Sequence, residues 1–189
     1  MWILSLEWLL LAVLVFWSIG ALKRLKRLRA QSKKAFEPVD AHFKLILALL
    51  RECGPQVTDE PSSLRHARSA LLPSADLLDA ALQQARQHPL RPEVIASLDS
   101  TWQSLQVAWR AYAQLSESTQ ACAPADAQAW TLRWQELDIL CCHSMAQFNT
   151  AVLHYNQAIA QVPVCVVARI FGFRPGRTFQ KDAALLMQP

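Results

Sequence analysis

Fifteen consecutive residues near the start of the chain, Trp8 to Leu22, carry no charge, and no other feature restricts the structure more strongly. Met1 to Leu6 extend this stretch, with Glu7 as the one interruption. A helix from Trp2 to Leu22 has 21 residues and measures roughly 31 Å, which matches a hydrocarbon thickness of about 30 Å. The sequence therefore predicts a transmembrane anchor over residues 1–22.

Positive charge follows the apolar stretch directly. Seven of the 19 basic residues lie between Leu22 and Ala35, and no acidic residue lies between Glu7 and Glu37. The rest of the chain has 12 basic and 15 acidic residues, so the formal charge of +4 comes from this segment. Such a segment predicts contact with membrane phosphates and disfavours nucleic acid as a partner. The residues that we expect at the membrane surface are Lys23, Arg24, Lys26, Arg27 and Arg29.

The order of charge and apolar residues also predicts the orientation. Because basic residues follow the span and none precedes it, the N-terminus is expected outside and the remainder in the cytoplasm. A cleaved signal peptide would have positive charge before the apolar region and a cleavage site after it, which is the reverse of this pattern. A buried core helix is the other alternative. We expect a single-pass protein of a bacterial inner membrane.

The remainder of the chain has the pattern of amphipathic helices. Only 4 glycines and 2 tyrosines are present, and apolar residues recur in steps of three and four, which is typical of helices that pack together. The predicted fold is all-α: an antiparallel four-helix bundle over residues 23–161, with the transmembrane helix continuous with the first bundle helix. Pro38 is expected to kink that helix near residues 34–38. Pro73 is expected to interrupt a later helix, with Ser74 capping its second half.

Two aromatic-asparagine pairs are the most specific local pattern. Phe148-Asn149 and Tyr155-Asn156 are seven residues apart, so both lie on nearly the same side of one helix. Core aromatics flanked by surface amides are one interpretation, and specified hydrogen bonds from the asparagines are the other. Pro163 is expected to stop or bend this helix. The segment 162–189, with its aromatic residues around glycines and prolines, is expected to pack on the bundle end, or else to contact a partner or lipid.

Asp40 lies on the flank of the first apolar stripe. A carboxylate at a helix seam is costly unless it is hydrogen-bonded. The last long helix is therefore expected to supply a partner, with Tyr155, Asn149 and Asn156 as the candidates. A solvated residue on the helix face is the alternative.

The residues that usually carry chemistry show no site. The five cysteines show no paired spacing, which favours packed thiols in a reducing compartment. Cys53 and Cys122 are expected on the cytoplasmic side, and the five histidines show no ligand spacing. No phosphate loop, nucleophile motif or pair of carboxylates is present. We expect neither an enzyme nor a bound metal or cofactor.

The two ends of the chain resemble one family. The segment FNTAVLHYNQAIAQVPVCVVARIFGFRP, Phe148 to Pro175, is similar to the repeated YN pattern and the GF-x-P motif of the LemA family of bacterial membrane-anchored helical proteins. That motif corresponds to Gly172, Phe173 and Pro175. LRAQSKKAFEPVDAHF, Leu28 to Phe43, is similar to the membrane-proximal helix of the family, whose aspartate matches Asp40. Phe148 replaces a tyrosine of the family pattern, and Val162 replaces the phenylalanine before Pro163.

The resemblance implies a helical bundle with an N-terminal anchor, and it implies no reaction. We therefore expect a non-enzymatic interaction or scaffold protein that docks a membrane or cytosolic protein, or a second copy of itself. The alternative is a structural protein that shapes the envelope or contacts anionic lipid through the basic residues beside the membrane.

Overall fold

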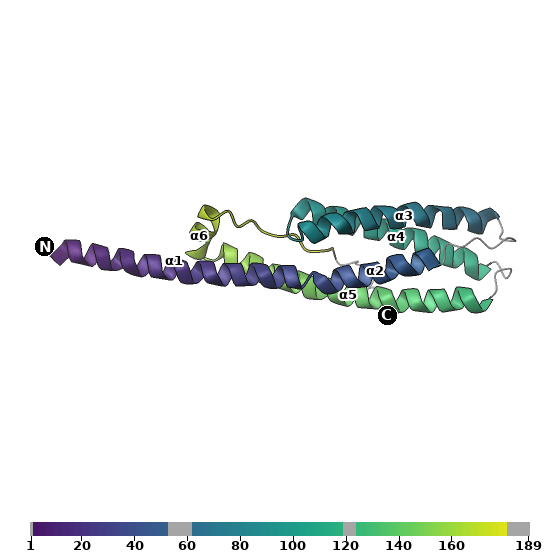
Figure 1. Cartoon of the computed structure of the whole chain (residues 1–189), viewed down its shortest axis with the longest axis horizontal. Coiled ribbons are helices and arrows are strands. Elements are labelled where there is room, and N and C mark those ends of the chain that lie inside the picture. Colours follow the sequence, from purple (N-terminus) through teal and green to yellow (C-terminus); the bar gives the residue numbers. More distant parts are fainter. Residues whose placement is uncertain (1, 53–61, 119–123, 181–189) are drawn as a thin grey trace.

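The computed structural model describes residues 2–52, 62–118 and 124–180, and every regular element in these ranges is an α-helix. The prediction of an all-helical chain is confirmed. The helices are α1 (Trp2–Lys34), α2 (Glu37–Glu52), α3 (Ser62–Gln87), α4 (Pro92–Ser118), α5 (Pro124–Ala160) and α6 (Val164–Ile170). Figure 1 shows an elongated molecule in which α1 extends beyond all the other helices.

A short break separates α1 from α2, so the expected continuous helix is divided. The N–H of Phe36 donates to the carbonyl of Lys33 at 3.1 Å, a tighter turn than in an α-helix. Pro38 follows within the first turn of α2, where its missing N–H costs little. The helix is therefore interrupted where a kink was expected, near residues 34–38, but it is not kinked there, because α1 and α2 keep nearly the same direction (Figure 1).

The expectation for Pro73 is wrong, because α3 continues through this residue without interruption. Pro73 has no N–H to donate to the carbonyl of Ser69, four residues earlier. Both residues are exposed, so this carbonyl can bind water instead. Ser74 does not cap a helix: its hydroxyl donates to the carbonyl of Ala70, within the helix, at 2.9 Å. Leu71, Ala75 and Leu78 are buried on both sides of the proline, and burial of this stripe offsets a proline cost of about 3 kcal/mol.

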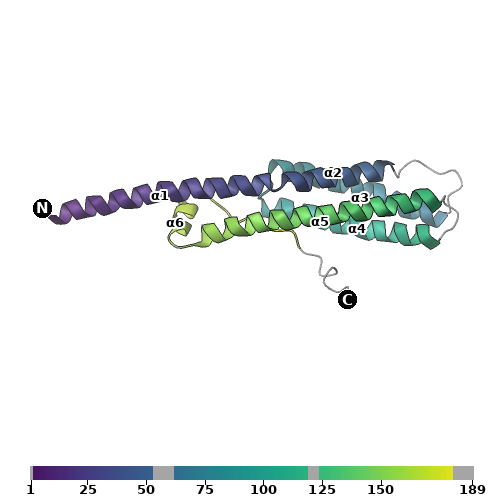
Figure 2. The ribbon, with the colours of Figure 1, turned by 90° about the horizontal axis from the view of Figure 1, so that it is seen from below.

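One hydrophobic core joins α2, α3, α4 and α5, which run side by side with successive helices in opposite directions (Figures 1 and 2). Aromatic rings connect α4 to its neighbours. Trp102 meets Phe43 of α2 edge-on, with ring centroids 5.1 Å apart. Trp134 of α5 stacks on Trp109 with centroids 4.3 Å apart. A smaller apolar cluster around Leu25 and Ala158 joins α1 to α5 and α6.

Candidate functional site

The exposure of α1 changes sharply along its length. Trp8 and Phe16 are 71% and 81% exposed, whereas Leu25, further along the same helix, is fully buried. This helix is long and apolar enough to cross a membrane. The apolar side chains that the structure describes between Trp8 and Ile19 are therefore exposed, on the part of the chain that precedes the packed residues.

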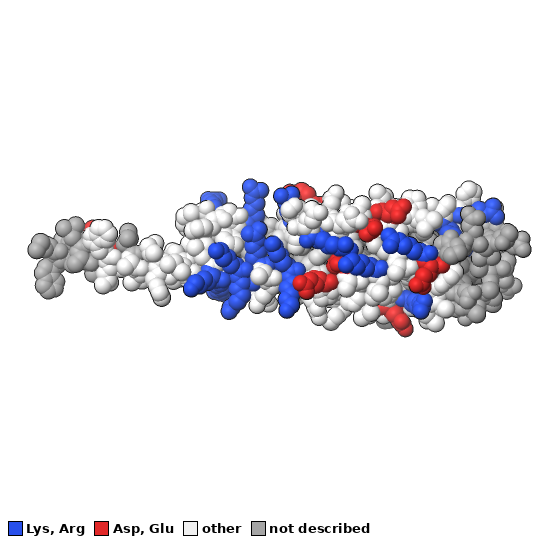
Figure 3. All heavy atoms as spheres, in the orientation of Figure 1, with Lys and Arg blue, Asp and Glu red and all other residues white. Residues whose placement is uncertain are grey.

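The expected membrane-surface residues form a basic band around α1, directly after its exposed apolar part. All five side chains of the band are exposed, and Figure 3 shows positive charge gathered at this level of the molecule. The guanidinium of Arg29 also lies over the ring of Phe173, 5.8 Å from its centroid. The residues of the basic band are Lys23, Arg24, Lys26, Arg27 and Arg29.

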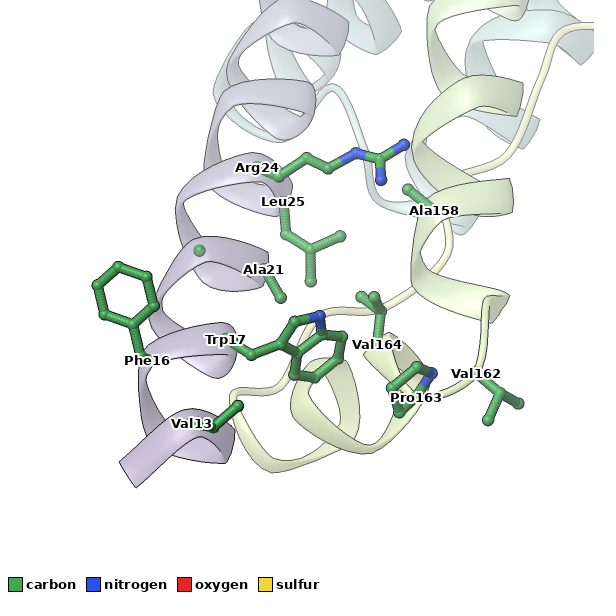
Figure 4. Close-up of a pocket in the computed structure, with 11 residues that line it drawn as sticks. Val13, Phe16, Trp17, Ala21, Arg24, Leu25, Ala158, Val162, Pro163 and Val164 are labelled. Carbon is green, nitrogen blue, oxygen red and sulfur yellow. The ribbon is translucent and has the colours of Figure 1, made fainter. Parts of the chain in front are cut away.

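An apolar cleft of about 630 Å³ lies where the exposed part of α1 meets the corner between α5 and α6. Trp17 extends from α1 toward Pro163 and Val164, and Arg24 extends across the cleft toward α5 (Figure 4). Pro163 lies at this corner as expected, after a cis peptide bond with Val162. The helices α5 and α6 meet at an angle of 99°. The corner also exposes Val162, Val166, Ile170 and Phe171.

The residues Phe171–Gln180, here called the C-terminal segment, run back along α5 and are held by side chains of that helix. Asn156 donates to the carbonyl of Gly176 at 2.8 Å and accepts from its N–H at 2.9 Å. Asn149 makes the same two bonds with the backbone of Phe179, at 3.0 and 2.8 Å. The two asparagines are seven residues apart in a helix, and the residues that they bind, Gly176 and Phe179, are three residues apart in non-helical backbone. The two spacings cover about the same distance.

The two aromatic residues of these pairs have different roles. Tyr155 donates its hydroxyl to the carbonyl of Arg174 at 2.9 Å. Burial raises the pKa of this tyrosine, with Arg29 acting in the opposite direction, so the hydroxyl keeps its proton and can donate. Phe148 is fully buried and meets the ring of Phe179 edge-on at 5.5 Å. The rings therefore pack in the core, as the first interpretation of the pattern has it, whereas the amides form the specified hydrogen bonds of the second interpretation and are not free surface groups.

Local backbone geometry explains the glycines of the segment. Gly172 ends α6 with φ +68°, a left-handed conformation that glycine adopts readily. The N–H of Phe173 donates to Ala168 at 2.9 Å and that of Gly172 to Arg169 at 3.3 Å, the bond pattern of a Schellman cap. Gly176 lies so close to α5 that an added Cβ would be 3.1 Å from a methyl of Val152. Pro175, the residue before it, is exposed.

Asp40 has hydrogen-bonding partners, but the prediction that they come from the last long helix is wrong. Its carboxylate binds Lys44 at 2.8 Å, one turn away, and the Nε of Arg86 on α3. The side chain of Asp40 is 16% exposed. The last long helix does not supply the partner, because its asparagines and Tyr155 are bonded to the C-terminal segment.

The sequence did not predict two hydrogen bonds, because each joins residues that are far apart in the chain. Asp99 on α4 accepts from the N–H of Gln180 at 3.2 Å and fixes the end of the C-terminal segment. Ser32 is fully buried in α1, with its hydroxyl 3.1 Å from the carbonyl of Ala151. The sequence does contain one indication of this contact: Ser32 is a small polar residue within the apolar stripe, and such a residue allows α1 and α5 to approach closely.

The cysteines and histidines form no metal site within the described ranges. Cys141 is buried, Cys142 and Cys165 are half-buried, and none of these three cysteines forms a disulfide. Burial, followed by the nearby Asp138 and Cys142, raises the pKa of Cys141 far above its ordinary value, which makes this thiol a poor nucleophile. Cys53 and Cys122 lie outside the described residues.

Comparison of the chain with known protein families, with characterised proteins and with solved structures finds no match.

Proposed function

We propose that the chain is a membrane-tethered helical module that binds another protein and catalyses no reaction. In this proposal residues 1–22 anchor the chain in a bacterial inner membrane. Helices α2–α5 form a four-helix bundle of the LemA type in the cytoplasm. The observation that carries the proposal is the division of α1 into two parts. The first has exposed apolar side chains, and the second packs through Leu25 while its basic side chains stay exposed.

The exposed apolar surface of α1 is unfavourable in water, and lipid would cover it. Trp8, Val13 and Phe16 are among the side chains that lipid would contact. The basic band would then lie among the headgroups, and the exposed apolar residues of the α5–α6 corner would lie at the same membrane surface. The positive-inside rule supports a cytoplasmic location for the bundle.

Fractionation of cells tests the anchor. The chain is expected in the membrane pellet after an alkaline wash, and a variant that starts at Ser32 is expected in the supernatant. A membrane-impermeant thiol reagent applied to intact cells should leave Cys53 and Cys122 unlabelled until lysis. Recovery of the full chain in the wash would contradict the anchor, and labelling of those cysteines in intact cells would contradict the orientation.

The exposed side of α5 supports a protein partner. Leu132, Ile139, Ala146 and Leu153 are seven residues apart in turn and all exposed, so one face of this helix presents an exposed apolar side chain every two turns, here called the stripe. Apolar side chains at one heptad position can pack against another helix. A helix of a membrane or cytosolic protein, or of a second copy of the chain, would cover it.

Crosslinking in the native membrane, read by mass spectrometry, tests this binding face. Ile139→Glu is expected to abolish crosslinks between α5 and the partner, because a carboxylate in an apolar interface is costly. Leu77→Glu is the matched control, since Leu77 is 62% exposed on α3 while Ile139 is 68% exposed. Equal crosslinking in the two variants, or crosslinks that never include α5, would contradict the role of the stripe.

The second candidate function is structural: the basic band contacts anionic lipid and no protein partner is needed. Five exposed cations directly after the apolar helix favour it, since each is worth about 1 kcal/mol near an anionic surface. Changing Lys23, Arg24, Lys26 and Arg27 to Gln separates the two functions. Crosslinks through α5 survive this change if a protein is bound, whereas a role in membrane shape is lost.

A further inference from the structure

A second cleft, of about 640 Å³, borders the basic band, which contributes Arg29 to its lining. Four parts of the chain that are distant in the sequence form it: the end of α1, the connection between α3 and α4, Tyr155 of α5, and the C-terminal segment. This basic cleft has four Lys and Arg residues in its lining, Arg29, Lys33, Arg91 and Arg174.

The positive charge of the basic cleft is poorly compensated. Glu93 is the one carboxylate in its lining, and among the described residues no salt bridge involves any of its four cations. Cations further along the bundle do have partners, as Arg51 has Asp79 and Arg86 has Asp40. Figure 3 shows the same contrast, with blue side chains gathered around the end of α1 and red ones interspersed further along.

The fold brings these charges together at a cost. Arg29 and Lys33 are one turn apart on α1, and like charges at this spacing destabilise a helix. The hydroxyl of Tyr155 holds the carbonyl of Arg174 and so fixes that residue at the cleft. The helix α4 begins at Pro92 in the lining, and the N-terminal end of a helix adds partial positive charge.

We propose that the basic cleft binds a phosphate-bearing ligand with more than one negative charge. Guanidinium groups match phosphate oxygens through paired charge-assisted hydrogen bonds, and three of the four cations are arginines. The volume lies within the range of about 300 to 1,000 Å³ that is usual for ligand sites. A phosphorylated metabolite in solution and the headgroup of an anionic lipid share this chemistry. The site goes beyond the proposed function and does not require membrane insertion.

Two measurements on the full chain in phosphatidylcholine nanodiscs or mild detergent test the proposal and identify the source of the phosphate. Calorimetric titration with pyrophosphate tests a soluble ligand. Native mass spectrometry after exposure to cardiolipin and to phosphatidylcholine tests a headgroup. Binding of pyrophosphate, or selective retention of cardiolipin, supports the site and assigns its source. Absence of both overturns it.

Matched variants locate the binding. Arg91→Gln and Arg174→Gln are each expected to weaken binding about tenfold, the factor that corresponds to one charge-assisted hydrogen bond. Arg110→Gln and Arg177→Gln remove the same charge from exposed positions that do not line the cleft, so these controls should retain the affinity of the parent. Equal weakening in all four variants would mean that the net charge of the protein, and not the cleft, determines the affinity. That result would overturn the proposal.

A membrane pellet assay on the same variants separates this inference from the proposed function. A chain that stays in the pellet without binding phosphate overturns the cleft alone. A chain that binds pyrophosphate but leaves the membrane on washing overturns the anchor alone.

Discussion

The side-chain amide of Asn149 forms two hydrogen bonds with the backbone of Phe179: Nδ2 donates to the carbonyl at 3.0 Å, and Oδ1 accepts from the N–H at 2.8 Å. A backbone in a β-sheet forms the same pair of bonds with a neighbouring strand, and here one side chain of a helix provides them. The ring of Phe179 is buried in the core next to Phe148. The C-terminal segment thus contributes Phe179 to the folded core, although no helix or strand contains the segment.

Asn149→Ala should release the end of the C-terminal segment. The change leaves a partly buried N–H and carbonyl of Phe179 without partners, which costs about 1 to 3 kcal/mol. Hydrogen exchange of residues 176–180 in the full chain should accelerate accordingly. Thr150→Ala, at the exposed neighbouring position, is the control and should exchange like the parent. Unchanged exchange in Asn149→Ala would show that the amide does not hold the segment.

Gly172→Ala should loosen α6. An alanine at φ +68° is strained by about 1 to 2 kcal/mol, so the Schellman cap should open more often. Hydrogen exchange of Val164–Ile170 measures this opening. Gly20→Ala is the contrasting substitution, because Gly20 lies inside a regular helix with open space around it. It should leave the exchange of α6 unchanged, and faster exchange in both variants would contradict the cap.

Asp40→Ala should lower the free energy of unfolding by less than the loss of a fully buried hydrogen-bond network would. The side chain of Arg86 is 37% exposed, and exposed ion pairs contribute about 0.2 to 1 kcal/mol. A double-mutant cycle of Asp40→Ala and Arg86→Ala, measured by urea unfolding, should give a coupling energy in that range. A coupling near zero would mean that the pair adds no stability.

Alkaline pH should destabilise the folded chain through Cys141. Because burial raises the pKa of this thiol above its ordinary 9.0, the unfolded chain loses the proton first. The stability is therefore complete below about pH 9 and falls as the pH rises further. Burial raises the pKa of Tyr155 as well, which adds a loss above about pH 10.

Urea midpoints measured across this pH range test the thiol contribution. Cys141→Ala should flatten the decline, whereas Val152→Ala should lower the midpoint at every pH without changing the slope, since Val152 is equally buried and does not titrate. An equal slope in Cys141→Ala and the parent would assign the decline to other groups.

Local patterns in the sequence determined much of this protein. The charge-free stretch before Lys23, the steps of three and four, and the break near Pro38 depend on residues within one or two turns of each other. They therefore predict the helices without knowledge of their neighbours. The two asparagines of α5 were also recognisable by their seven-residue spacing, although this spacing did not distinguish surface amides from specified hydrogen bonds.

Only the tertiary structure decided which groups meet. Pro73 remains inside α3 because burial of a long apolar stripe outweighs its local preference, and no local pattern measures that burial. Asp40 pairs with Arg86, 46 residues away, and Asn149 with backbone 30 residues away, because helix packing sets these distances. The basic cleft depends on the same cause: Arg29, Arg91 and Arg174 are far apart in the sequence, and they come together only when the helices pack and the C-terminal segment folds back along α5.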